Sequence, residues 1–127
     1  MPLDPLWVPD RAEVIFINHS PAKGQEIPDQ HPMLVLSPKS FNDKTGIVIG
    51  FPMTHSASHK DNPFALPFDG PKGQAYVLGH QPKSFDWRER EGRPHAWGGG
   101  HHEMLAEATA LLDDVCGIVD AVSSVKK

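Results

Sequence analysis

Residues 27–56, IPDQHPMLVLSPKSFNDKTGIVIGFPMTHS, contain two nearly all-apolar runs separated by a polar segment. The runs PMLVLS (32–37) and IVIGFPM (47–53) are rich in the aliphatic and β-branched residues that favour strands. Because neither run alternates apolar with polar residues, both faces of each strand are expected to be buried. The connection PKSFNDKTG (38–46) contains an Asn-Asp pair and a glycine, so it is predicted to be a turn.

Further strands are expected on both sides of this pair. They are AEVIFIN (12–18), PFALPF (63–68), QAYVLG (74–79) and, as a last short strand, RPHAW (93–97). The prolines in PFALPF indicate an edge strand, because proline cannot donate a ladder hydrogen bond. Long polar loops are predicted over 19–30 and 55–62, and the proline-rich residues 1–11 are predicted to form an extended arm.

The C-terminal segment 101–122, HHEMLAEATALLDDVCGIVDAV, has the period of an amphipathic helix. Its apolar residues recur at spacings of three and four: Leu105, Ala108, Leu111, Leu112, Val115, Ile118, Val119 and Val122. Gly117 costs about 1 kcal/mol relative to alanine inside a helix, so a frayed or kinked C-terminal end is expected. Cys116 lies on the apolar stripe and is expected to be a buried, unreactive thiol. Glycines 98–100 provide a hinge that returns the helix to the sheet.

The 127 residues predict a single domain of the α+β class, mainly β. Five or six short strands and one terminal helix describe a small, curled antiparallel barrel with the helix packed against it. The single cysteine excludes an intramolecular disulfide and favours a reducing, cytoplasmic setting. The sequence contains no run of 18 apolar residues and no secretory signal pattern at its start, so no membrane association is expected.

Charge is unevenly distributed along the chain. The formal net charge of −4 argues against a wholly basic nucleic-acid-binding surface. Residues 72–93 nevertheless carry five Lys or Arg against three Asp or Glu, whereas residues 94–127 carry two against five. The first segment could contact phosphate groups while the acidic segment faces elsewhere, and a solvated loop of mixed charge is the alternative.

Eight histidines raise the question of a metal site. His55 and His59 are four residues apart, but their segment is predicted to be a loop and no cysteine pair accompanies them, so a metal site is not favoured. The sequence also lacks a nucleophile elbow and a phosphate-binding glycine loop. His31, Thr54 and His80 remain as candidates, although a histidine or threonine beside a strand is more often a structural residue.

The order of motifs resembles the MazF/PemK/Kid family of bacterial toxins, which are RNA endonucleases of type II toxin–antitoxin systems. The resembling stretches span about residues 12–90 and include GQEIPDQHP (24–32), MLVLSPKSFNDKTGIVIGFPMT (33–54), NPFALPF (62–68) and GHQPKSFDWRER (79–90). The resemblance implies an SH3-like barrel, a homodimer, a concave surface for single-stranded RNA and a cognate antitoxin protein. It also implies a bacterial, cytoplasmic enzyme that needs no cofactor and no metal.

The catalytic residues implied by the resemblance are His31, Thr54 and His80. Thr54 matches the threonine of the family, whereas His31 stands in place of its active arginine and His80 in place of an aspartate. In the family, the RNA 2′-hydroxyl attacks the adjacent phosphorus and leaves a cyclic phosphate and a 5′-hydroxyl. Histidine can supply the base or the acid near neutral pH, although it lacks the bidentate fork of arginine.

Four further residues are expected to bind RNA: Lys60, Gln81, Lys83 and Arg88. Two other functions stay open. One is a degenerate family member that binds RNA or antitoxin with little cleavage. The other is a gyrase-poisoning toxin of the same fold, similar to CcdB; such toxins use an aromatic tip on the terminal helix, whereas this chain ends in VSSVKK (122–127).

Overall fold

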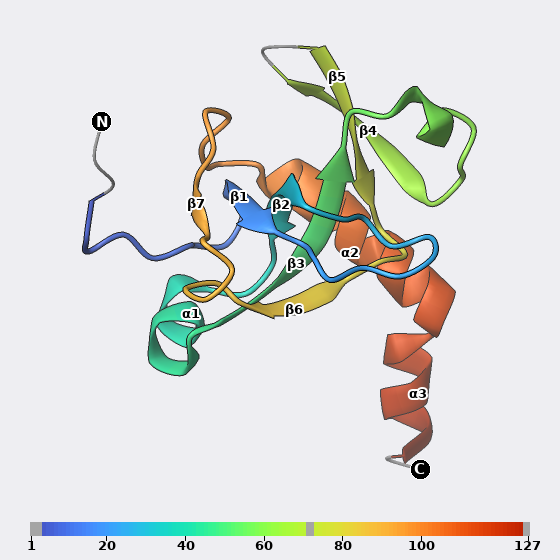
Figure 1. Ribbon diagram of the computed structural model, residues 1–127. Coiled ribbons are helices and arrows are strands. Elements are labelled where there is room, and N and C mark those ends of the chain that lie inside the picture. Colours follow the sequence, from blue (N-terminus) through green and yellow to red (C-terminus); the bar gives the residue numbers. More distant parts are fainter. Residues whose placement is uncertain (1–3, 71–72, 126–127) are drawn as a thin grey trace.

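The structure is a computed structural model that describes residues 4–70 and 73–125 (Figure 1). Its elements in chain order are β1 (Val14–Asn18), β2 (Gln30–Val35), α1 (Lys39–Thr45), β3 (Ile47–Thr54), the 3-10 helix η1 (Ala57–His59), β4 (Ala65–Gly70), β5 (Gly73–Leu78), β6 (Lys83–Asp86), β7 (Arg93–Pro94), α2 (His102–Cys116) and α3 (Ile118–Val125). This order confirms the predicted α+β class with mainly β structure. Residues 1–3 of the expected N-terminal arm lie outside the described ranges.

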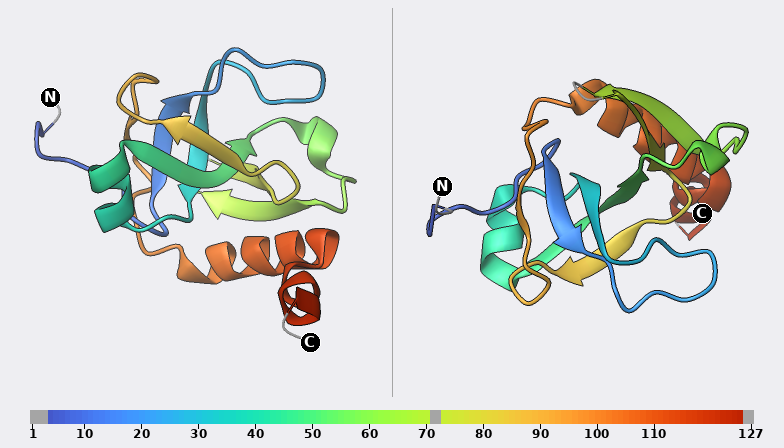
Figure 2. Two further views of the ribbon diagram at one scale, coloured as in Figure 1. Left: turned by 90° about the horizontal axis from the view of Figure 1, so that it is seen from below. Right: turned by 45° about the horizontal axis from the view of Figure 1, so that its top comes forward.

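The strands form one curled antiparallel sheet in the order β4-β5-β3-β2-β1-β7 (Figure 2). β3 is central: β2 lies on one side, and β5 and β6 share the other. The proline-containing strand β4 is at an edge, as its sequence predicted. Pairing among the described strands does not close the ladder, so the sheet is an open barrel.

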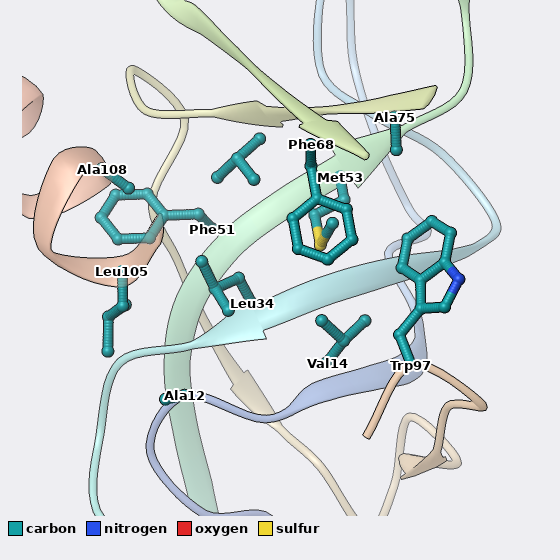
Figure 3. Close-up of a cluster of buried hydrophobic side chains, with 11 residues drawn as sticks. Ala12, Val14, Leu34, Phe51, Met53, Phe68, Ala75, Trp97, Leu105 and Ala108 are labelled. Carbon is teal, nitrogen blue, oxygen red and sulfur yellow. The ribbon is translucent and has the colours of Figure 1, made fainter. Parts of the chain in front are cut away.

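Two hydrophobic clusters explain why the central runs lack alternation. The first lies between the sheet and α2, where Leu34 and Phe51 meet Leu105 and Ala108 (Figure 3). The second lies on the opposite face of the same strands and comprises Ile15, Ile17, Met33, Val35, Val48, Phe85 and Trp87. Burial of each large aliphatic or aromatic side chain contributes about 1.5–3 kcal/mol, so both faces of β2 and β3 stabilise the fold.

The segment 38–46 is a helix, and its prediction as a turn is wrong. Asn42, taken as a breaker, is fully buried in α1, where its amide donates to the carbonyl oxygens of Pro9 (2.8 Å) and Ser37 (3.0 Å). The indole of Trp87 donates to the Asn42 carbonyl at 2.9 Å. These tertiary hydrogen bonds outweigh a weak local preference. Gly46 does end the segment, with φ of 73° in the left-handed region.

Two further differences concern the last strands. β6 was not predicted, because only Phe85 of its four residues is apolar and buried. It is nevertheless paired with β3 in register from Ile47↔Asp86 to Gly50↔Lys83. The last strand, expected over 93–97, is reduced to the two residues of β7.

The terminal helix divides at Gly117, as its sequence predicted. Gly117 adopts φ of 61° and ends α2, with its N–H bonded to the Asp113 carbonyl at 2.6 Å. Only the first half of the apolar stripe, including Leu105 and Ala108, is buried. Cys116 is exposed, so its expected burial is wrong: α2 has passed the edge of the sheet at this point. None of the described helices is long and apolar enough to span a membrane.

Candidate functional site

His31 and Thr54 lie at the same end of two neighbouring strands. The last pair between β2 and β3 is Met33↔Pro52, and extending this register by two residues sets His31 opposite Thr54. Residues two apart on a strand share a face, so both side chains project from the face of the second hydrophobic cluster. Both residues therefore lie at the same end of that face, its polar end.

The hydrogen bonds of these residues leave defined groups available for chemistry. The Nδ1 atom of His31 donates a hydrogen bond to the Pro28 carbonyl oxygen at 2.6 Å. In a neutral imidazole this leaves Nε2 as the acceptor nitrogen. Thr54 is 4% exposed, and its Oγ1 accepts from the Ser56 N–H at 3.2 Å, which leaves the hydroxyl hydrogen able to donate.

His19 is a buried member of this end that the sequence reasoning missed. It is 2% exposed, and its Nε2 lies 3.3 Å from the His31 carbonyl oxygen. The pKa of His19 is lowered to about 4, mainly by burial; the hydrogen bond to the His31 carbonyl opposes this shift, and the charges of His31, Lys83 and Arg90 add to it. His19 is therefore neutral at pH 7. The only signal in the sequence is its place directly after an apolar strand, within a segment assigned to a loop.

Lys83 supplies positive charge beside this end. It is the first residue of β6, two residues from Phe85, so its side chain projects from the same face. Its Nζ lies 3.1 Å from Oε2 of Glu26, an exposed carboxylate in the β1–β2 loop. The pKa of Glu26 is lowered, first by a hydrogen bond from the Lys23 backbone N–H and second by the hydrogen bond from the Lys83 side chain. An incoming phosphate oxygen could replace that carboxylate at Lys83.

His80 and Gln81 lie in the turn between β5 and β6 and line a separate pocket. This loop pocket has a volume of about 400 Å³ and is lined by Gln25, Glu26, His59, Asn62, His80 and Gln81. Gln81 donates from Nε2 to the Gln25 carbonyl at 3.2 Å, and His80 lies against the Phe64 ring. Among the hydrogen bonds and ring contacts of the described residues, none joins His80 to His31 or Thr54.

Lys60 and Arg88 lie at other places around the barrel. Lys60 is exposed at the end of η1, where its N–H bonds the Ala57 carbonyl. Arg88 lies beyond the other end of β6, beside α1. Its guanidinium is 3.3 Å from Asp43 and 4.3 Å from the centre of the Trp87 ring. The structure therefore brings His31, Thr54 and Lys83 to one end and places Arg88 apart from them.

The remaining histidines do not assemble into a ligand set in the part of the chain that the structure describes. No group of three or more His, Cys, Asp or Glu side chains there has an arrangement that could hold a metal ion. The His101 ring is instead bonded to the Trp97 carbonyl at 2.8 Å. The chemistry available at the polar end is that of an acceptor imidazole nitrogen, a hydroxyl and an ammonium group, a set suited to proton transfer and to contact with an anion.

Known proteins are similar to this chain in sequence and in fold. The family model described as PemK-like, MazF-like toxin of type II toxin–antitoxin system matches residues 10–114. The endoribonuclease toxin MazF of Escherichia coli is 36% identical over 84 residues, which cover 66% of this chain and 74% of that protein. The crystal structure of MazF from Deinococcus radiodurans has a TM-score of 0.77 at 31% identity and covers 87% of this chain and 98% of that one. A MazE–MazF crystal structure from the same organism has a TM-score of 0.69 at 29% identity, covering 87% and 97%.

Proposed function

This chain belongs to the PemK-like, MazF-like family of toxins of type II toxin–antitoxin systems, and on that basis we propose that it is an endoribonuclease that cleaves single-stranded RNA. The observation that carries the proposal is the polar end of the second hydrophobic cluster. His31, Thr54 and Lys83 come from the same end of β2, β3 and β6, and one phosphodiester would bind there between the His31 acceptor nitrogen, the Thr54 hydroxyl and the Lys83 ammonium.

The proposed reaction is transfer of the phosphoryl group to the neighbouring 2′-oxygen. Nε2 of His31 takes the proton of the 2′-hydroxyl, and the 2′-oxygen of the RNA forms a bond to phosphorus. The Thr54 hydroxyl and Lys83 donate hydrogen bonds to the phosphoryl oxygens, where negative charge develops. The bond from phosphorus to the 5′-oxygen breaks, and that oxygen takes a proton from water. His80, which the resemblance implies as a catalytic residue, lines the separate loop pocket, so we assign it to RNA binding and not to proton transfer. The products are a 2′,3′-cyclic phosphate and a 5′-hydroxyl.

The proposed step needs no metal, because side chains supply the base and the positive charge. Lys60, Gln81 and Arg88 would bind RNA around the reacting phosphate, and selective contacts there would make cleavage sequence-specific. We place the enzyme in the bacterial cytoplasm, where RNA is found and where its single cysteine stays reduced.

We also propose two protein partners. The first is a cognate antitoxin, by analogy with the MazE–MazF complexes of relatives. Its disordered acidic or apolar tail would fold over the polar end, between the loops 19–30 and 55–62, and exclude RNA. The second partner is another copy of this chain, in a homodimer.

The direct test is incubation of the purified protein with a long RNA in excess chelator, followed by mapping of the 5′ ends. The proposal expects discrete cuts whose downstream products carry 5′-hydroxyl groups. As a matched control, an RNA with a single 2′-deoxy nucleotide before the cut should resist cleavage at that bond alone. Cleavage of the deoxy substrate, or activity only with added divalent metal, would contradict the proposed reaction.

A degenerate protein that binds RNA and cuts little is a second candidate, and one observation favours it. His31 replaces a guanidinium, so the site lacks a permanent charge that can grip phosphate with two hydrogen bonds. Substitution of His31 by arginine separates the two functions, because it adds the permanent charge and removes the proton acceptor.

A further inference from the structure

The loop pocket is built by three segments that are far apart in sequence. Gln25 and Glu26 come from the β1–β2 loop, His59 and Asn62 from the β3–β4 connection, and His80 and Gln81 from the β5–β6 turn. Glu26 forms part of its wall and also pairs with Lys83 at 3.1 Å. The pocket is therefore adjacent to the polar end at which the proposed reaction takes place.

Two buried polar atoms of this pocket lack partners within the described ranges. Gln81 donates from Nε2 to the Gln25 carbonyl at 3.2 Å, which fixes the orientation of its amide and leaves Oε1 as a buried acceptor without a partner. The same Nε2 lies 3.3 Å from Nε2 of His80, which therefore accepts from it. The ring proton of His80 is then on Nδ1, a buried donor that is also without a partner.

A ligand that has both a hydrogen-bond donor and an acceptor would satisfy these two atoms, because Oε1 of Gln81 accepts and Nδ1 of His80 donates. A buried polar group without a partner costs about 1–3 kcal/mol, and a ligand that supplies the missing hydrogen bonds recovers this free energy. The other polar groups of the wall are amide and imidazole groups, and its one charged group is the Glu26 carboxylate, which repels an anion. The pocket is therefore suited to a neutral polar ligand and not to a phosphate.

Aromatic rings favour a flat ligand. The Phe64 ring is 41% exposed, and its centre lies 5.5 Å from that of the His80 ring with the planes 41° apart. The His59 imidazole lines the loop pocket, and its Nδ1 is 3.4 Å from the Asn62 amide nitrogen. Planar heteroaromatic groups stack well on such rings.

We propose that the loop pocket binds one nucleobase of the RNA and selects it through an adjacent donor and acceptor on the base edge. The inference rests on the proposed function, because the pocket shares Glu26 with the phosphate-binding end. Gln81 and His80 read the edge of the base, and Phe64 and His59 stack against its faces. The selected base is attached to a nucleotide next to the cleaved bond.

The test compares cleavage of RNAs that differ in a single base on either side of the cut. The parent protein is expected to prefer one base at one position by about 10-fold or more, the range of a good pair of edge hydrogen bonds. Gln81→Met keeps the side-chain length but removes the amide, and should reduce this preference to within about 3-fold. His59→Asn keeps an acceptor for Asn62 but removes the ring, and should weaken the same preference. Asp61→Asn, an exposed neighbour outside the pocket, should change nothing.

Retention of the parent preference in both Gln81→Met and His59→Asn would overturn the base-reading role. If the parent cuts no RNA, the proposed function fails, and fluorescence anisotropy with oligo(A), oligo(C) and oligo(U) then decides on the pocket. Discrimination among these oligonucleotides that Gln81→Met abolishes would support a base pocket in a protein that binds without cutting. Equal affinity for all three, or discrimination that survives in Gln81→Met, would overturn it.

Discussion

The hydrogen bond between Nδ1 of His31 and the Pro28 carbonyl orients the ring at the proposed site. It leaves Nε2 as the nitrogen that can take a proton. His31→Ala should therefore abolish cleavage, with a loss of about 10²–10⁴-fold from the missing base. RNA affinity should stay within a few-fold, because the imidazole serves as a proton acceptor and carries no permanent charge to pair with phosphate. Single-turnover cleavage and equilibrium binding on the same RNA check the two effects.

His31→Arg distinguishes an adapted site from a decayed one. If the imidazole is the working base, the arginine variant should cut no faster than the parent, because a guanidinium does not release its proton at neutral pH. A marked gain in rate would sink the base role of His31. Such a gain would identify the protein as a weakened relative of an arginine-dependent nuclease. The substitution would then restore a side chain that donates two hydrogen bonds to the phosphate.

The buried imidazole of His19 makes stability depend on pH in a defined window. Unfolded, histidine has a pKa near 6.5, whereas the pKa of His19 in the fold is about 4. Between these values the unfolded chain binds more protons than the folded chain, so stability rises with pH. Its contribution is complete above about pH 6.5, and about 3 kcal/mol is lost as the pH falls to 4.

Urea unfolding of the parent and of His19→Gln at several pH values measures this difference. The free energy of unfolding of the variant at neutral pH is expected to differ from that of the parent, because the contact with the His31 carbonyl is changed. The relevant readout is the change between pH 4 and 6.5, which should be shallower in the variant. Equal slopes in both proteins would show that His19 does not carry the effect.

The sequence places His31 and Thr54 at the ends of two recognisable strands, and their meeting in one site stays a prediction. His19 could not be assigned in the same way. Its burial depends on Phe85, a residue of a strand that the sequence did not predict, whose ring lies 5.3 Å from the imidazole. A histidine beside a strand is equally common on the surface, so only the tertiary contact decides its environment.

At the scale of elements, the sequence predicted those whose apolar pattern is strong and missed those that depend on distant partners. The buried strands β2 and β3 are rich in aliphatic residues, and their positions follow from that pattern alone. Helix α1 is stabilised by the bonds of Asn42 to Pro9 and Trp87, and β6 by its pairing with β3. Neither partner is visible within the local segment, which is why a turn was predicted in one case and nothing in the other.

Strand β6 separates the two basic residues expected to bind RNA. Lys83 begins the strand at the polar end, whereas Arg88 lies in the turn after its other end, beside α1, so the length of the strand, about 10 Å, separates the two ends. An RNA must therefore run along β6 to contact both residues. Lys83→Ala should weaken binding of short and long RNAs and make the salt dependence shallower by about 0.7. Arg88→Ala should do so only for RNAs extended by several nucleotides.

Lys44→Ala, which removes an exposed charge from α1, is the matched control and should leave both slopes unchanged. Affinity is measured across a salt series with one short and one extended RNA. If Arg88→Ala lowers the melting temperature but changes no salt slope, Arg88 serves the contact of Asp43 and Trp87 with α1 and not RNA.

In the whole molecule, the two faces of the sheet have different roles. Helix α2 packs on one face of the sheet and covers the first cluster (Figure 2). The second cluster lies on the other face, whose polar end carries His31, Thr54 and Lys83. The general architecture follows from the sequence because apolar runs and one amphipathic helix leave few ways to bury their surface. The curl that brings the β1–β2 loop to the β5–β6 turn depends on pairing across the sheet. The loop pocket therefore had no local signal.

Helix α3 projects from the barrel (Figure 1), and its large apolar side chains are exposed. Five of the eight large hydrophobic residues exposed in the described chain lie there or just before it: Val115, Ile118, Val119, Val122 and Val125. A groove of about 640 Å³ runs beside them, lined largely by apolar groups that include Leu36 and Leu105. Within a homodimer, α3 of one copy could occupy the groove of the other. This contact would bury surface that the single chain leaves exposed.

Substitution of Val119 and Val122 together by aspartate tests this arrangement. The parent is expected to sediment as a dimer and the double variant as a monomer, because each exposed valine would be replaced by a charge that cannot be buried unpaired. Ser124→Asp, which adds a charge at another exposed position of α3, should remain dimeric. Both valines are at least half exposed, so the melting temperature of the monomer should change little. A double variant that stays dimeric would place the contact elsewhere, and a monomeric parent would refute the homodimer itself.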